Sequence, residues 1–336
     1  MLGVSFVAEK RILVAGASGY AGALAAELVD RHPALKLAAA TSRSDAGQRL
    51  SALYPQYRCE VVLEELALGA HGQLDGAIVA YPHGASAPVV AELRAAGVPV
   101  VDLSADFRLS DQAVYEQWYV PHSAPELLAG AVYGLPERNR EQIKGAGLVA
   151  NPGCYPTASV LALAPLAPFI SDVVIDAKSG VSGAGREASA VTHFVSVDEN
   201  VRPYGVGQHR HMPEIDQELA LAGARELTVT FTPHLVPLDQ GELVSCYVTL
   251  NEQVDIDALY REAYGGERFV EVVDHLPGVR EVRGTNLCRI NVSIDERTGK
   301  AFVFAVIDNL WKGAASQAIQ NLNLMLGFPE DQGIEP

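Results

Sequence analysis

The feature that most constrains the fold is a glycine-rich turn near the N-terminus, set between two apolar segments of different character. Residues 10–16, KRILVAG, form a short run of apolar and β-branched residues that is typical of a buried strand. Residues 17–33 are rich in Ala and Leu at helical spacing and end at Pro33, which predicts a helix. A strand, a tight turn and a helix in this order open an α/β fold with a parallel sheet.

The rest of the chain divides into two parts of different texture. In the first part, the apolar runs 77–81 and 98–103 flank a helix-like segment at 85–96, and further apolar runs lie at 35–40 and 148–151. Apolar strands that alternate with helices predict a parallel sheet covered on both faces. In the second part, strand candidates follow one another with fewer helices between them: 173–177, 227–232, 243–250, 289–294 and 301–307. A helix rich in Ala, Gln and Leu ends the chain at 309–326.

These segments predict an α/β protein that consists of a Rossmann-type parallel-sheet domain plus an inserted α+β domain with a mixed or antiparallel sheet. No polar linker separates the two parts. We expect the first domain to comprise residues 1–152 and 309–336, with the final helix packed back on it, and the inserted domain to comprise residues 153–308.

The glycine turn has the position that a dinucleotide site requires, after the first strand and at the start of a helix. Gly16 permits the tight turn, Gly19 lets a phosphate approach the backbone, and Gly22 allows close packing of helix and strand. The spacing is GxxGxxG, which is weak as a motif, and the alternative is a turn that serves packing only. The candidate cofactor-binding residues here are Gly16, Ser18, Gly19, Tyr20, Ala21 and Gly22.

The end of the second strand indicates which dinucleotide binds. Sites that prefer NAD place Asp or Glu there to bind the ribose hydroxyl. Here the strand runs into Thr41, Ser42 and Arg43, and hydroxyls beside a guanidinium suit the 2′-phosphate of NADP. An ordinary polar loop is the alternative.

Cys154 stands apart from the other three cysteines of the chain, which lie in segments without such a context. It follows a Pro-Gly turn at the end of a strand, and Pro156 marks the first turn of a helix. A helix N-terminus lowers a thiol pKa and raises the thiolate fraction, so Cys154 is the candidate nucleophile. The alternative is a small buried residue at a turn.

The segment HRHMPEI at 209–215 holds the candidate bases. Pro213 starts a helix, so His211 lies just before it, and Glu214 in the first turn is placed to accept a hydrogen bond from His211. His209 is expected to point to the other side of an extended segment. The alternatives are a zinc site, for which no third ligand follows, and histidines on an exposed loop. We expect no metal.

Two further segments have the composition of anion sites. SGVSGAGR at 179–186 combines glycines, hydroxyls and an arginine, which suits a backbone nest for a phosphate or carboxylate; Ser182 and Gly183 are the candidate substrate-binding residues. A flexible loop is the alternative. Arg108 lies at the carboxyl end of a strand, where α/β sheets bind ligands.

Composition narrows the remaining possibilities. The net charge is −16, and no Lys- or Arg-rich run appears, so we expect binding neither to nucleic acid nor to a membrane surface. No signal peptide or membrane span is predicted. Four scattered cysteines without CxxC spacing favour a reduced, cytoplasmic protein.

Taken together, several segments resemble the N-acetyl-γ-glutamyl-phosphate reductases, which are similar in fold to aspartate-semialdehyde and glyceraldehyde-3-phosphate dehydrogenases. The resemblance spans Gly16 to Asn321 and is specific as a combination. It is carried by PHGAS, DLSADFR, NPGCYPT, SGVSGAGR, HRHMPEI and DNLWKGAASQAIQN.

The resemblance implies an arginine-pathway enzyme in which Cys154 attacks an acyl phosphate, phosphate leaves, and NADPH delivers hydride to the thioester. It also implies that His211 is the acid/base, that His209 and Arg108 lie near the substrate, and that the inserted domain serves catalysis and dimerisation. Homodimers or homotetramers are expected. Residues implied to lie close to the nicotinamide are Ser179, Gly180 and Asn309.

The sequence departs from the family at Gln240, where an Arg usually precedes the glycine, and a glutamine cannot hold an anion as a guanidinium does in a substrate or structural contact. Two other hypotheses stay open. One is the lysine-pathway relative that reduces an aminoadipyl phosphate on an acidic carrier protein, although a chain at −16 offers little basic surface for docking. The other is a non-catalytic NADP-binding sensor, which would have no use for Cys154.

Overall fold

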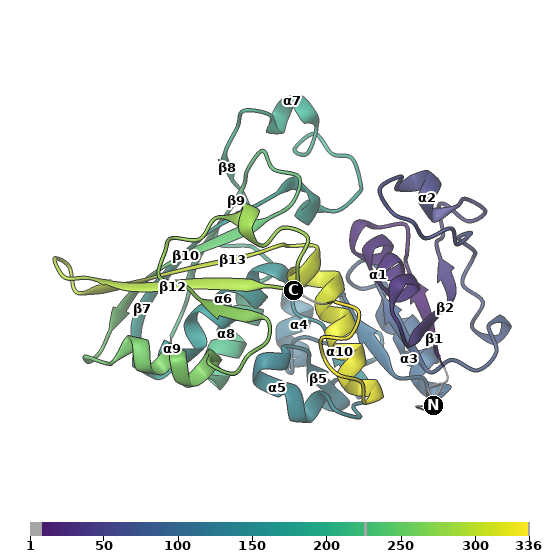
Figure 1. The fold of residues 1–336 in the computed structure, drawn as a ribbon, viewed down its shortest axis with the longest axis horizontal. Helices are drawn as coiled ribbons and strands as arrows, with labels where there is room; N and C mark the ends of the chain where they lie inside the picture. The colour runs from purple at the N-terminus through teal and green to yellow at the C-terminus, as the bar shows by residue number, and fades with distance from the viewer. Residues whose placement is uncertain (1–8, 225–226, 335–336) are drawn as a thin grey trace, which may run out of the picture. The chain divides into compact units, whose positions relative to one another are not determined.

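The computed structural model describes residues 9–224 and 227–334. These residues form two compact units, each with its own sheet (Figure 1). Within the described residues, the first unit consists of 9–110, 121–151 and 318–334, and the second consists of 111–120, 152–224 and 227–317. In the described part of the chain, no helix is both long and apolar enough to cross a membrane.

The first unit contains a six-stranded parallel sheet in the order β2-β1-β3-β4-β6-β5. The chain moves outward in one direction from β1 to β2 and in the other from β3 onward, so the topological switch point lies between β1 and β3, where α/β sheets bind ligands. The strands are β1 (Lys10–Ala15), β2 (Leu35–Thr41), β3 (Gly76–Val79), β4 (Val100–Asp102), β5 (Ala131–Tyr133) and β6 (Leu148–Ala150).

Helices pack on this parallel sheet because its central strands are apolar on both faces; all four residues of β3 are buried. α1 packs on β1 and β2, α3 packs on β3 and β4, and α10 brings Leu322 against Ile12 and Gly76. The helices are α1 (Tyr20–Arg31), α2 (Leu50–Leu53), α3 (Ala87–Ala95), α5 (Pro136–Ile143) and α10 (Ser316–Leu326), of which α10 begins in the second unit.

The second unit contains a seven-stranded mixed sheet in the order β11-β12-β13-β10-β7-β9-β8. β10 is antiparallel to both of its neighbours, β7 and β13, whereas β7 and β9 are parallel. The strands are β7 (Ile170–Ser179), β8 (Arg202–Pro203), β9 (Thr230–Leu235), β10 (Glu242–Leu250), β11 (Val270–Val272), β12 (Cys288–Asp295) and β13 (Lys300–Ile307).

α6 is the central helix of the second unit. It packs on β10 and β13 and against α8, and Figure 1 shows α6, α8 and α9 along one side of the sheet. Nine of its ten residues are buried, which leaves Cys154 at its N-terminus as the exception. The helices are α4 (Gln112–Trp118), α6 (Cys154–Leu163), α7 (Phe194–Val197), α8 (Met212–Leu221) and α9 (Ile256–Tyr264).

The predicted fold class is confirmed, with two local corrections. The strand expected at 227–232 begins only at Thr230, because its ladder with β7 starts at the Val174–Thr230 pair. The helix expected from 309 begins as an α-helix at Ser316, after a wide π-helical turn over Trp311–Ala315. The Asp308 carboxylate accepts hydrogen bonds from the N–H groups of Leu310 and Trp311 and so fixes the start of this turn.

Candidate active site

The glycine turn of the first unit lies at the switch point between β1 and β3. Gly16 has a φ of +87°, and a Cβ there would lie 2.6 Å from the carbonyl oxygen of Ala80, which follows β3. A Cβ at Gly22 would lie 2.2 Å from the carbonyl oxygen of Gly16. Gly19 is the N-cap of α1. A Cβ there would lie 3.8 Å from the carbonyl oxygen of Gly16 and within 4 Å of no other described atom, so the surface at Gly19 is open. The two outer glycines serve close packing, and the middle one leaves room for a phosphate.

The loop after β2 meets the same turn. The Ser42 hydroxyl donates to Ser18 Oγ at 2.8 Å, and the exposed Arg43 guanidinium lies 5.4 Å from the ring centroid of Tyr81. Hydroxyls, a guanidinium and the helix N-terminus form a donor set that fits a dinucleotide with a 2′-phosphate. The sequence reasoning missed Asp45, whose buried carboxylate accepts from the Ser44 hydroxyl at 2.5 Å.

Tyr20 and Ala21 form the first turn of α1. Tyr54 supports this turn, because its hydroxyl donates to the Ser18 carbonyl at 2.7 Å and its ring packs edge-on against Tyr20. The start of the helix is therefore held from outside the glycine motif itself.

Cys154 is the first residue of α6, as the sequence predicts. The Gly153 N–H, in the turn before it, donates to Glu214 Oε1 at 2.9 Å. Cys154 is half-buried, whereas the other three cysteines are buried, and burial raises the pKa of the Cys59 thiol to about 11. Burial also raises the pKa of the Cys246 thiol far above its usual range. Cys154 is thus the accessible thiol of the four.

An aromatic cluster surrounds the residue after the nucleophile. The Tyr155 ring lies edge-on to His209, His211 and Phe231, with centroid distances of 5.5, 5.9 and 5.3 Å. The expectation that His209 points away from His211 is wrong: their ring centroids are 4.9 Å apart. The segment turns rather than extends, because the Met212 N–H donates to the His209 carbonyl.

The two histidines differ in their surroundings. His209 Nδ1 accepts the backbone N–H of His211 at 3.2 Å, which favours the tautomer with the proton on Nε2. Burial and, to a smaller extent, the neighbouring charge of Arg210 lower the pKa of His209 to about 4. His209 is therefore neutral at physiological pH. His211 is the N-cap residue of α8, and Glu214 lies in the first turn of that helix, as the sequence predicts.

Three amides of the predicted backbone nest at 179–186 are already paired within the protein. The N–H groups of Gly180, Val181 and Ser182 donate to carbonyl oxygens of the β9–β10 loop, at Gly241, Leu238 and Asp239. At Gly180, Val181 and Ser182 an anion would have to be held by other groups, because these three amides are paired within the protein.

Asn309 fixes the same loop from the end of β13. Its Oδ1 accepts from the Gly241 N–H at 2.8 Å, and its Nδ2 donates to Ser182 Oγ at 3.0 Å. A Cβ at Gly183 would lie 2.9 Å from Ser179 Oγ, and one at Gly180 would lie 2.7 Å from the Asp239 carbonyl oxygen. The predicted residues of this region therefore lie together, in close contact.

Arg108 lies in the first unit, buried at the carboxyl ends of β4 and β6. Its Nε donates to the Asn151 carbonyl at 2.8 Å, and its Nη2 donates to the Leu103 carbonyl at 2.7 Å. Part of the guanidinium thus holds the segment that leads, three residues later, to Cys154.

Two residues near the departure from the family pattern were not expected at the site. The backbone carbonyl of Gln240 accepts from Arg283 Nη2 at 2.9 Å, so a guanidinium from another segment contacts position 240. Glu242, the first residue of β10, is completely buried, and its carboxyl lies against the Cys154 thiol. The signal was present in the sequence, because Glu242 is in alternating register with Val244, Cys246 and Val248 of an apolar strand.

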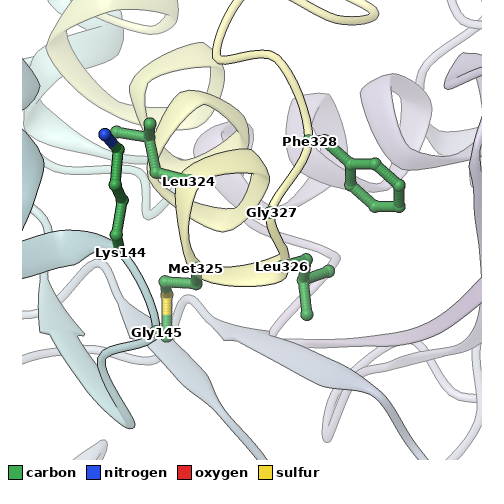
Figure 2. A pocket seen from close by; sticks show the side chains of 7 residues that line it. All are labelled: Lys144, Gly145, Leu324, Met325, Leu326, Gly327 and Phe328. Atoms are coloured by element: carbon green, nitrogen blue, oxygen red, sulfur yellow. The ribbon is translucent and has the colours of Figure 1, made fainter.

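A cavity of about 430 Å³ lies elsewhere in the first unit, around the C-terminal end of α10 (Figure 2). It is lined mainly by apolar side chains and contains none of the predicted site residues; its lining residues are Lys144, Gly145, Leu324, Met325, Leu326, Gly327 and Phe328. Across residues 9–224 and 227–334, no group of three His, Cys, Asp or Glu side chains is arranged to hold a metal ion.

Comparison with known proteins agrees with both units. Residues 11–146 match the semialdehyde dehydrogenase NAD-binding domain, and residues 154–309 match the semialdehyde dehydrogenase dimerisation domain. Among solved structures, an aspartate semialdehyde dehydrogenase II from Vibrio cholerae, complexed with ASA, has a TM-score of 0.74 at 19% identity and covers 95% of this chain and 98% of its own. An aspartate semialdehyde dehydrogenase with NADP from Candida albicans has a TM-score of 0.71 at 16% identity, covering 95% and 99%. These likenesses establish the fold.

Curated relatives are much closer in sequence. The N-acetyl-gamma-glutamyl-phosphate reductase of Syntrophobacter fumaroxidans is 49% identical over 338 residues, covering 97% of this chain and 98% of the relative. The reductase of the same name from Moorella thermoacetica is 47% identical, covering 96% and 97%. Since these relatives match along nearly their whole length and both semialdehyde dehydrogenase domains are present, the chain belongs to the N-acetyl-gamma-glutamyl-phosphate reductase family.

Proposed function

We propose that this protein reduces N-acetyl-L-glutamyl 5-phosphate to N-acetyl-L-glutamate 5-semialdehyde and phosphate with NADPH, in arginine biosynthesis. The observation that carries the proposal is Cys154, a half-buried thiol at the N-terminus of a buried helix, beside a cluster that holds two histidines. Residues 1–152 and 309–336 are assigned to NADP binding, and residues 153–308 to catalysis and dimerisation.

The nucleophile divides one difficult reduction into two easier steps. Cys154 Sγ attacks the acyl carbon, a C–S bond forms, and the bond to the phosphate oxygen breaks with its electron pair on phosphate. NADPH, when bound, supplies the hydride that reduces the resulting thioester. Collapse of the reduced adduct breaks the C–S bond, releases the aldehyde and restores the thiolate.

His211 is assigned as the acid/base, which provides the proton that the leaving phosphate takes up. The neutral His209 is the weaker candidate, because its Nδ1 is engaged and its pKa is about 4. Glu214 is assigned to orient His211 and the Cys154 turn together, an assignment supported by its hydrogen bond to the Gly153 N–H. A proton transfer of this kind contributes roughly 10²- to 10⁴-fold in rate.

The remaining roles follow the chemistry of each group. Substrate binding is assigned to Arg108, His209, Ser182 and Gly183. Cofactor binding is assigned to the glycine turn and to the loop after β2, supported by the open surface at Gly19 and the exposed guanidinium of Arg43; the full set is Gly16, Ser18, Gly19, Tyr20, Ala21, Gly22, Ser42, Arg43, Ser179, Gly180 and Asn309.

The reaction is best tested in the reverse direction, because N-acetylglutamate semialdehyde is easier to handle than the acyl phosphate. We expect phosphate-dependent reduction of NADP by the wild-type protein, and loss of this activity in Cys154→Ala and Cys154→Ser. Full activity in the alanine variant would remove Cys154 from the mechanism. Equal activity with a longer aminoadipyl semialdehyde on its carrier protein would redirect the substrate assignment.

A cytoplasmic homodimer or homotetramer is the assembly we propose, on the support of the matched dimerisation domain at 154–309. Light scattering of the purified protein gives the mass of the assembly directly, and a monomeric mass at assay concentrations would contradict the proposal.

A further inference from the structure

Glu242 is an acidic residue at a completely buried position of a strand, where apolar residues are usual. It begins β10 and pairs with Ser179 of β7 on one side and Ile307 of β13 on the other. The next three alternate residues of the strand, Val244, Cys246 and Val248, are completely buried, and so is Glu242 itself. The carboxyl therefore points into the helix-covered side of the sheet rather than into water.

The Glu242 carboxyl lacks the partners that a buried carboxylate normally has. Neither oxygen is exposed, and no donor of residues 9–224 and 227–334 meets either oxygen with full hydrogen-bond geometry. The polar group that lies against it, within hydrogen-bonding reach, is the Cys154 thiol. An unsatisfied buried carboxyl is costly, so its position beside the nucleophile requires a reason other than stability.

We propose that Glu242 is a catalytic residue that accepts the thiol proton of Cys154 when Sγ attacks the substrate, and returns it when the thiolate is released. This proposal rests on the assignment of Cys154 as the nucleophile of the proposed function. It adds a second proton path to that of His211, which provides the proton taken up by phosphate.

The proton transfer balances within one turnover. The step starts from the form of the pair that has lost one proton, with the remaining proton on sulfur. The S–H bond breaks, this proton moves to the Glu242 carboxylate, and Sγ uses the freed electron pair to form the C–S bond of the thioester. After reduction, the C–S bond breaks with its electron pair on sulfur. The thiolate then takes the proton back from the carboxylic acid, and Glu242 returns to its starting form.

The electrostatic surroundings match the two groups to each other. Burial and, to a smaller extent, the nearby Asp308 raise the pKa of Glu242, the contact with Cys154 opposes the shift, and the resulting pKa is about 8. An ordinary thiol has a pKa of about 8.5 and an ordinary carboxyl one of about 4.3, so the raised pKa of Glu242 narrows the difference in proton affinity between a carboxyl and a thiol. Tyr155 and Tyr204, which also lie within the field of Glu242, stay neutral because burial raises the pKa of both phenols.

Such a pair titrates as a unit rather than as two separate groups. As the pH rises through about 8, the pair loses its first proton, and the remaining proton is shared between sulfur and oxygen. The second proton is lost only at higher pH, because its loss creates a second negative charge close to the first in the same buried site. The reactivity of the Cys154 thiol should therefore change with pH in two steps, because it depends on the protonation of the Glu242 carboxyl as well as on that of the thiol.

The test measures this signature in the free protein, without substrate. The rate of Cys154 alkylation by iodoacetamide is followed from pH 5 to pH 11 in the wild type and in Glu242→Gln, with alkylation at Cys154 verified by mass spectrometry. We expect two steps in the wild type and one step in the glutamine variant, which keeps the shape of the side chain but cannot titrate. An unchanged two-step profile in Glu242→Gln would overturn the proposal.

Two further variants make the result specific. Glu271→Gln removes one negative charge from β11, three strands away from β10 in the sheet, and should keep the wild-type profile. Glu242→Asp keeps a carboxyl and should retain two steps, whereas kcat/KM of Glu242→Gln should fall by about 10²-fold or more. A fall in kcat/KM with an unchanged alkylation profile would count against proton transfer and for a merely structural role.

If Glu242→Gln does not fold, the wild-type protein still decides the question by infrared difference spectroscopy. We expect a carboxylic acid C=O band that persists above pH 6 and shifts when Cys154 is alkylated. Absence of the band, or a band indifferent to alkylation, would overturn the proposal. Because these measurements need no substrate, they fail or succeed independently of the identity of the acyl phosphate.

Discussion

Replacing Gly313 with alanine would place a methyl group against the nucleophile. The added Cβ would lie 2.8 Å from Cys154 Cβ and 3.3 Å from both the Asp308 carbonyl oxygen and Ile307 Cδ1. Carbon atoms pack favourably at about 3.5–4.0 Å, so Cys154 or the turn after β13 must move by about 0.7 Å. Neither can move easily, since α6 is buried along its length and Asp308 fixes the turn by hydrogen bonds.

The magnitude follows from this geometry. Overpacking of a well-packed site costs about 1–3 kcal/mol, so we expect a lower Tm but a folded protein. Misplacement of a reacting atom by 1 Å costs about 10²-fold in rate, which places the expected loss of kcat for Gly313→Ala at about 10- to 10²-fold.

The assay compares kcat and Tm of Gly313→Ala with those of Gly266→Ala, a matched control in the same unit. A Cβ at Gly266 meets no described atom within 4 Å, and its φ is not in the left-handed range, so this variant should be indistinguishable from the wild type. Wild-type turnover in Gly313→Ala would refute the reasoning, because it would mean that the position of the nucleophile is not set by this contact.

Four other outcomes are expected. In Gly22→Ala, a Cβ placed 2.2 Å from the Gly16 carbonyl oxygen should abolish NADPH binding, measured by fluorescence; retained affinity would contradict the tight turn. In Arg43→Ala, KM for NADPH should rise about tenfold, the loss of one charge-assisted contact, while KM for NADH stays the same; an unchanged ratio would place the 2′-phosphate elsewhere. In pH–rate profiles, His209→Asn should keep the pH dependence of the wild type near neutral pH, since His209 does not titrate there, whereas His211→Asn should lose it. The reverse pattern would exchange the roles of the two histidines. Because the pKa of Glu242 is raised in the folded protein, the stability that its protonation contributes is fully present below the unfolded pKa of about 4.3 and is lost as the pH rises towards 8. In thermal unfolding over that pH range, Glu242→Gln should therefore lose less stability than the wild type, by at most about 5 kcal/mol. Parallel stability curves of the two proteins would contradict this.

The first unit was predictable from sequence because its signals are local. The run of apolar residues in β1, the glycine turn and the helical spacing of α1 each depend on a few neighbouring residues. By contrast, β5 and β11 have three residues each, too few to show a period of two, and they exist as strands because distant segments, β6 and β12, pair with them.

The site was predictable only in part, for a related reason. The positions of Cys154 and Gly16 were predicted correctly, because each lies in a turn between a strand and a helix that the local sequence indicates. The proximity of His209 and His211 was missed, because the segment was expected to be extended, whereas it turns. Both histidines also pack against the Tyr155 ring, 54 residues away from His209 along the chain. The pairing of three amides in the predicted nest at 179–186 was also not foreseen, because their partners lie in a loop that is far away in sequence.

Glu242 shows that the alternating burial pattern of a strand can also indicate a functional residue. An apolar strand with period two tells which residues are buried, and an acid in that register is an inconsistency between local pattern and global fold. Such inconsistencies are costly, and a chain keeps them where they serve a function, so the register of β10 alone marks position 242 for attention. The sequence cannot tell what the acid faces, because the contact is made between a strand and a helix almost 90 residues apart. Only the packing of α6 on β10 identifies the nucleophile as its neighbour.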